Sequence, residues 1–174
     1  GPFSCRQVHR LIGRRSEPGI RKGLDRLVEQ GIVLRRKVGN TYLHSLNRDH
    51  LAAEAIVAVA HLREAAFEYM CGLLQRWPTP PMFAAVFGST AREEEKPRSD
   101  IDVLVVRPAD VEVEAWDRSV SSFTTTMSRA TGSDVRVLEM TREELWDDGN
   151  EALRGHLVRD SITLYGDRQV LYAR

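Results

Sequence analysis

The sequence predicts an α/β (α+β) protein in which two modules are joined by a long helix, and three observations support this fold class. From residue 82 onward, short apolar runs alternate with amphipathic helical patterns, which is typical of a mixed sheet with flanking helices. Residues 1–48 contain two short helical patterns followed by two β-prone runs. Residues 49–77 keep apolar residues at helical spacing and contain no proline. We therefore expect three parts, residues 1–48, 49–77 and 82–174.

The bulk composition is that of an ordinary globular protein, with 42% apolar and 29% charged residues in a chain of 174. No apolar run approaches the ~20 residues that a membrane span needs, and no signal-peptide pattern opens the chain, so we expect no membrane partner. Cys5 and Cys71 lie far apart without metal-ligand spacing, which indicates free thiols and a cytoplasmic location. Gly1-Pro2 in place of a methionine suggests that native residues precede the chain.

Charge is unevenly distributed, although the chain as a whole is neutral. Residues 1–50 carry eleven Arg and Lys against four Asp and Glu, whereas residues 51–174 carry fourteen against twenty-one. This asymmetry indicates two modules with different partners, and a compact basic module favours nucleic acid.

The first module has the start and stop signals of two helices and a hairpin. Ser4 and Gln7 have the spacing of a capping box, and Ser16 is placed to cap a second helix. A Gly-Asn pair between β-prone runs favours a tight hairpin. The expected elements are a helix over 4–13, a helix over 17–31, and a hairpin of residues 32–38 and 41–46.

This order of two helices and an Arg- and Lys-rich hairpin resembles the winged helix-turn-helix over residues 3–48. The resemblance implies that the helix over 17–31 enters the major groove of double-stranded DNA. The family's usual first helix is not visible, and we expect it upstream of residue 1. The alternative is a solvated basic helix and hairpin that pack on the second module. The candidate DNA contacts are Arg21, Lys22 and Arg26 on the helix and Arg35, Arg36 and Lys37 in the wing.

The second module follows a helix that ends at Trp77-Pro78, because proline cannot continue a helix. Apolar runs with high β-propensity alternate from there with amphipathic stretches. The expected elements are a connecting helix over 49–76, strands over 83–87, 100–106, 134–138 and 161–166, and helices over 116–130 and 143–158.

Two carboxylates lie two residues apart on one of these strands, at Asp100 and Asp102. Residues at i and i+2 on a strand project to the same face, so the two anionic groups repel each other unless a cation lies between them. Hard oxygen ligands on a rigid strand suit Mg²⁺, which completes its coordination with waters and nucleotide phosphates. The pattern therefore predicts a metal-dependent site that handles phosphate.

Together with Gly88-Ser89 and the ten residues between, Asp100 and Asp102 resemble the nucleotidyltransferase domain of the DNA polymerase β superfamily, over residues 82–166. Asp134, which opens the next strand, matches the family's third carboxylate. The resemblance implies two Mg²⁺ ions held by the three aspartates, with Asp134 sharing the second ion and helping to deprotonate an acceptor hydroxyl. It also implies that the triphosphate lies at Gly88, Ser89 and Arg92, although Arg92 could equally pair with Glu94 or Glu95.

Three functions remain open. The first is an enzyme that moves a nucleoside monophosphate from an NTP, with ATP the expected donor, to a hydroxyl of a protein, an RNA end or a small molecule. The second is a DNA-binding transcriptional regulator whose second domain senses a nucleotide without turning it over. The third is a toxin-antitoxin component that modifies a partner protein. The acceptor is not encoded in any local motif, a prokaryotic source is expected, and the connecting helix is the expected surface for a homodimer.

Overall fold

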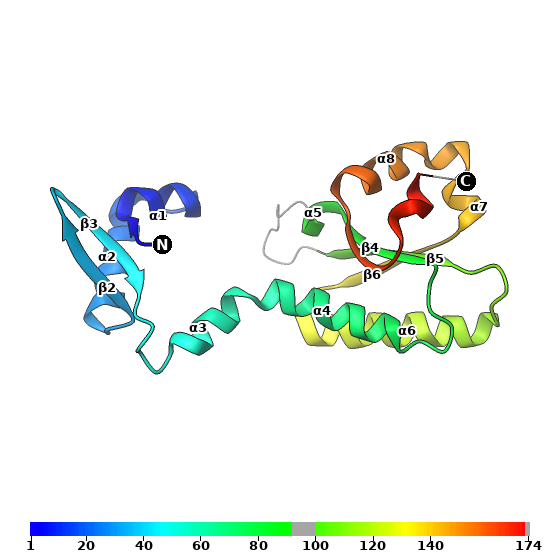
Figure 1. Cartoon of the computed structure of the whole chain (residues 1–174), viewed down its shortest axis with the longest axis horizontal. Helices are drawn as coiled ribbons and strands as arrows, with labels where there is room; N and C mark the ends of the chain where they lie inside the picture. The colour runs from blue at the N-terminus through cyan, green and yellow to red at the C-terminus, as the bar shows by residue number, and fades with distance from the viewer. Residues whose placement is uncertain (92–99, 173–174) are drawn as a thin grey trace. The chain divides into compact units, whose positions relative to one another are not determined.

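The computed structural model describes residues 1–91 and 100–172, and the chain divides into two compact units, Gly1–Leu62 and Arg63–Arg174. The order of the elements along the chain can be followed in Figure 1. The predicted connecting segment, 49–77, is thus shared between the two units.

The first unit begins with two helices and a three-stranded antiparallel sheet of order β1-β3-β2, and a third helix follows them. The capping box of Ser4 and Gln7 is present, and the hydroxyl of Ser16 accepts from the backbone N–H of Gly19, so both helices begin where the sequence predicted. The short β1, which the sequence did not predict, pairs with the hairpin. The elements are β1 Phe3–Ser4, α1 Cys5–Ile12, α2 Glu17–Glu29, β2 Val33–Val38 and β3 Thr41–Leu46.

The predicted long helix over 49–76 is two helices, α3 Ala53–Ala60 and α4 Leu62–Gln75. The start differs from the prediction because the Nδ1 of His50 accepts from the backbone N–H of Ala52, which favours a turn ahead of α3. At the break, the backbone N–H of His61 is shared between two carbonyls of the last turn of α3, each 3.1 Å away. Such a three-centre bond is typical of a helix end. The apolar periodicity continues through this break, so the sequence pattern could not reveal it.

The second unit is built on a mixed four-stranded sheet of order β6-β5-β4-β7, as predicted. β5 pairs in parallel with β6, while β4 pairs in antiparallel fashion with both β5 and β7. Helices α4 and α6 cover one face, and α7, α8 and a 3₁₀ turn cover the other (Figure 1). The elements are β4 Phe83–Phe87, α5 Gly88–Ala91, β5 Ile101–Arg107, α6 Val113–Thr131, β6 Val135–Thr141, α7 Arg142–Leu145, 3₁₀ turns Asp148–Asn150 and Arg168–Leu171, α8 Glu151–Asp160 and β7 Ile162–Gly166.

Strand alternation divides the core of the second unit between the two faces. Val103 and Val105 pack toward α4 and α6, whereas Leu104 and Val106 pack toward α7 and α8. On the α4/α6 face, the ring of Trp77 meets those of Trp116 and Phe123 edge to face, with centroids 5.1 and 6.1 Å apart. The indole N–H of Trp116 donates to a carboxylate oxygen of Glu139 at 2.6 Å.

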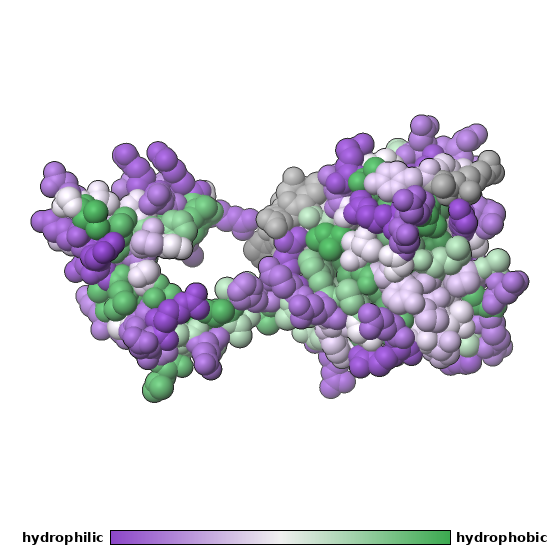
Figure 2. Space-filling view, viewed as in Figure 1, coloured by the Kyte–Doolittle hydropathy of each residue, from purple (hydrophilic) through white to green (hydrophobic). Residues whose placement is uncertain are grey.

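Apolar side chains are also exposed on the first unit, as the green residues among purple ones in Figure 2 show. On and around α3, Leu51 is fully exposed, and Val59 and Leu62 are 65% and 61% exposed. None of the helices formed by the described residues has both the length and the hydropathy that a membrane crossing requires.

Candidate functional site

The turn after β4 lies directly against the carboxylate strand. Phe87, the last residue of β4, is the cross-strand partner of Asp102, and Gly88 then turns with a φ of +75°. A Cβ built on Gly88 would lie 2.9 Å from Oδ2 of Asp102, closer than real Cβ atoms approach. Both the left-handed backbone and this close approach require glycine here. The absent side chain leaves a cradle beside the carboxylate.

Asp102 lies in β5, whereas Asp100 directly precedes the strand that was predicted to begin with it. The i, i+2 spacing places the two carboxylates on one side of the chain. Asp102 shares the face of Leu104 and Val106, which pack toward α7 and α8, while Ile101 is buried on the opposite face. The side chain of Asp100 is 36% exposed, so it is open to solvent beside the half-buried Asp102.

Two contacts fix the α5 turn to the start of β5. The buried hydroxyl of Thr90 donates to the backbone carbonyl of Asp100 at 3.1 Å. From α4, a guanidinium nitrogen of Arg63 donates to the backbone carbonyl of Thr90 at 2.6 Å, and the same guanidinium lies over the ring of Phe67. Arg63 was not among the predicted site residues, because no local pattern links α4 to a turn 27 residues later.

Asp134 lies at the same edge of the sheet, one strand away. Its backbone carbonyl accepts from the N–H of Ile101 at 2.8 Å, and the next N–H, that of Val135, donates to the hydroxyl of Ser128 on α6 at 3.0 Å. These bonds fix where β6 begins relative to β5. The side chain of Asp134 is 63% exposed.

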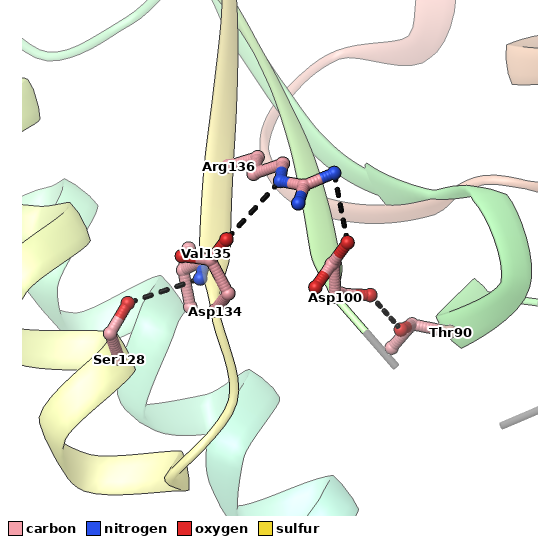
Figure 3. A network of polar contacts seen from close by, with 6 residues as sticks. All are labelled: Thr90, Asp100, Ser128, Asp134, Val135 and Arg136. Atoms are coloured by element: carbon pink, nitrogen blue, oxygen red, sulfur yellow. Dashed lines mark hydrogen bonds and ion pairs between the residues drawn. The ribbon is translucent and has the colours of Figure 1, made fainter. Parts of the chain in front are cut away.

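Arg136 lies between the carboxylates and contacts two of them (Figure 3). Its Nη1 is 2.8 Å from Oδ2 of Asp100, and its Nε donates to Oδ2 of Asp134 at 3.2 Å. In the parallel register, Arg136 is also the cross-strand partner of Asp102. Arg136 was not among the predicted site residues, although the period of two that relates Asp100 to Asp102 also puts Asp134 and Arg136 on one face.

The pKa of Asp102 is raised above its ordinary value. Burial is the largest cause, since it disfavours the charged carboxylate, and the negative charge of Asp100 adds to it. The positive charge of Arg136 acts in the opposite direction. Burial and the charge of Asp100 together therefore outweigh the stabilisation that Arg136 gives to the ionised form of Asp102.

Two of the three aspartates could hold a divalent cation together. Asp100 and Asp102 offer hard oxygens on one face of a rigid strand, and the cradle at Gly88 leaves room beside Asp102. Among residues 1–91 and 100–172, no group of three or more His, Cys, Asp or Glu side chains is placed to hold a metal ion. The third carboxylate, Asp134, is instead engaged by Arg136.

Two of the basic residues predicted to contact DNA, Arg21 and Arg35, lie next to acidic side chains of α2. On α2, Arg21 lies 3.8 Å from Glu17, and Arg35 of β2 forms a 2.9 Å ion pair with Asp25 of the same helix. Arg35 also lies over the ring of Tyr42. The remaining predicted contacts, all exposed, are Lys22 and Arg26 on α2 and Arg36 and Lys37 on β2; Arg92, the predicted triphosphate contact, lies outside the described residues.

A family model described as "Nucleotidyltransferase domain" matches residues 72–159, just over half of the chain. Among solved structures, a toxin-antitoxin with AMP-PNP is similar at a TM-score of 0.43, with 20% identity over 60% of this chain and 77% of that chain. A tri-AMPylated HEPN toxin of Shewanella oneidensis in complex with MNT antitoxin gives a TM-score of 0.41, with 18% identity over 62% and 75% of the two chains. No curated protein matches the chain.

Proposed function

We propose that this chain, which belongs to the nucleotidyltransferase domain family, transfers a nucleoside monophosphate from an NTP to an acceptor hydroxyl at the Gly88–Asp102 turn. The chain is a nucleotidyltransferase, and the proposal concerns where and how it acts. The observation that carries it is the close approach of Gly88 to Asp102, with Asp100 on the same face.

In the proposed reaction, the oxygen of the acceptor hydroxyl attacks the α-phosphorus of the NTP. A bond forms between that oxygen and the α-phosphorus, the bond from the α-phosphorus to the α,β-bridging oxygen breaks, and pyrophosphate leaves with the bond's electrons. The hydroxyl's proton passes to Asp134, which is exposed at the edge of the site. ATP is the expected donor because it is the most abundant NTP in cells.

Asp100 and Asp102 are the residues proposed to hold Mg²⁺. When bound, the ion supplies positive charge that stabilises the phosphate oxygens as negative charge moves onto the leaving group. Gly88 and Ser89 are proposed to receive the triphosphate, since a glycine lets phosphate oxygens approach the backbone. Thr90 and Arg63 hold this turn against the start of β5, so we assign them the role of positioning the binding residues.

The test follows the label from four NTPs carrying a labelled α-phosphate, with Mg²⁺, in the presence and absence of cell lysate. The wild type is compared with Asp102→Asn and with a matched control, Asp117→Asn, which removes an exposed carboxylate from α6. Transfer by the wild type and the control, and its loss in Asp102→Asn, supports the proposal. Absence of transfer and of pyrophosphate release in every condition would favour a regulator that senses a nucleotide.

The same experiment addresses the acceptor. Label on a protein band from lysate supports protein modification, which the toxin-antitoxin hypothesis requires, and label on nucleic acid supports an RNA acceptor. Label on neither macromolecule, with pyrophosphate released, indicates a small molecule.

Binding of double-stranded DNA by residues 3–48 is a second proposal, and two observations favour it. The sheet order β1-β3-β2 beside two helices is compatible with the winged helix that the sequence resembles, and the first 50 residues carry a large excess of positive charge. Against this, Asp25 and Glu17 neutralise part of the charge at Arg35 and Arg21. Lys22 and Arg26, which have no acidic partner among the described residues, are therefore the strongest candidates for contact with DNA.

The test measures duplex binding at several salt concentrations. Replacing Lys22 or Arg26 by Ala should weaken binding at all sequences and reduce the slope of log K against log salt by about 0.9 for each phosphate that the variant no longer neutralises. Arg10→Ala, an exposed change on α1, is the control. A duplex binding constant that changes neither with salt concentration nor with either substitution would contradict the proposal.

A homodimer through the exposed apolar side chains of α3 stays a prediction. Val59→Glu should leave a monomer if this surface joins two copies, because a buried unpaired carboxylate is costly. Sedimentation equilibrium distinguishes the two states, and a wild type that is monomeric at all concentrations would refute the prediction.

A further inference from the structure

Three carboxylates and one guanidinium share the edge of the sheet where β5 and β6 begin. Asp100, Asp102 and Asp134 carry three negative charges when ionised, and Arg136 carries one positive charge at any physiological pH. Arg136 contacts the two outer carboxylates directly and lies across from the third in the strand register. The group as a whole is therefore left with two negative charges.

The position of Arg136 is built into the backbone. Its strand is held in register by seven successive pairs between β5 and β6, and the start of that strand is tied to Ser128 of α6. A guanidinium is a planar fork with several donors, so one side chain can bind two separate carboxylates at once. Nη1 and Nε use this fork to join Asp100, directly before β5, and Asp134, directly before β6 (Figure 3).

We propose that Arg136 is a fixed cation that takes the place of a second divalent ion, so that the carboxylates bind one ion only. This inference rests on the proposed function, since it concerns how the same site handles metal. The charge balance supports it, because two remaining negative charges match one divalent cation. The proposed single-ion site differs from the two-ion site that the family resemblance implies.

The carboxylate oxygens support the same conclusion. Arg136 engages one oxygen of Asp100 and one of Asp134, while the oxygens of Asp102 receive no direct ion pair within the described residues. A second ion at Asp134 would have to displace the guanidinium or lie beside it, and the repulsion between like charges disfavours both. In this proposal, the carboxylate of Asp102 and the second carboxylate oxygen of Asp100 coordinate the single ion.

The test counts bound Mn²⁺ by electron paramagnetic resonance, without nucleotide, in the wild type, Arg136→Gln and Arg136→Lys. We expect one ion per wild-type chain, and Arg136→Gln should bind a second ion or bind the first about tenfold more tightly, because a repelling charge is gone. Arg136→Lys, which keeps the charge, should stay close to the wild type. Arg118→Gln, which removes an exposed arginine paired with Glu112 and Glu114, is the control.

Arg136 is 63% exposed, so its loss should not prevent folding, and the lysine variant gives an independent comparison. Two ions in the wild type would overturn the inference, as would Arg136→Gln that binds Mn²⁺ like the wild type. Label transfer with two bound ions would reject the inference but leave the proposed function standing. A wild type that binds no Mn²⁺ and transfers no label would reject both.

Discussion

Replacing Gly88 by Ala tests whether label transfer depends on the close approach of Gly88 to Asp102. Alanine at a left-handed φ of +75° costs about 1–2 kcal/mol of folding free energy. For a unit of this size, that corresponds to a melting temperature lower by about 4–8 °C. In addition, the new Cβ would lie 2.9 Å from Oδ2 of Asp102, so the carboxylate must shift. Because displacement of a reacting group by an ångström can cost about 100-fold in rate, we expect a loss of that order in label transfer.

Gly132 provides a matched control, since it ends α6 with a φ of +72° and has open space where a Cβ would lie. Gly132→Ala should therefore lower the melting temperature by a similar amount but leave transfer unchanged. Melting followed by circular dichroism, and transfer measured well below both melting temperatures, separate the two effects. Equal transfer by the two variants would refute the proposal that Gly88 shapes the site.

Three further predictions concern stability. Because burial raises the pKa of Asp102 in the folded state, its ionised form destabilises the protein at pH 7, so Asp102→Asn should raise the melting temperature there. The gain should shrink as pH falls through the raised pKa, and a difference that stays constant with pH would contradict this. Gly166→Ala should lower the free energy of unfolding by about 3 kcal/mol or more, because the new Cβ would lie 2.1 Å from the carbonyl oxygen of Met82, a backbone atom that cannot move aside. Denaturant titrations should show a larger loss for this variant than for Gly132→Ala. Trp77→Ala should cost about 3–5 kcal/mol by the same measurement, since the indole is 8% exposed and packs edge to face on Trp116.

The sequence predicted those parts of the site that follow from local periodicity. Asp100 and Asp102 share a face because side chains alternate along any strand, and the turn after Phe87 follows from an apolar run that ends in Gly88. What the sequence could not provide is register. The pairing of Phe87 with Asp102, and of Asp102 with Arg136, joins residues far apart along the chain, and no local pattern encodes it.

For Arg136, the alternation of side chains along a strand predicts the face but not the contacts. Alternation puts Arg136 on the same face as Asp134, yet only the parallel register of β5 and β6 brings it within 2.8 Å of Asp100. The basic residues of the first unit follow the same logic. Their positions on α2 and β2 were predictable, but the ion pair between Arg35 and Asp25 depends on how the hairpin packs on the helix.

The edge-to-face pair of Trp77 and Trp116 lies in the second unit, and this placement makes tryptophan fluorescence a probe of that unit. All three tryptophans of the chain, Trp77, Trp116 and Trp146, belong to the second unit, and the first unit has none. Indole fluorescence excited at the red edge of the absorption band therefore reports on the second unit alone, while far-ultraviolet dichroism averages over both. If the two signals change at different denaturant concentrations, the units unfold separately, and the stability of each can be assigned without cutting the chain.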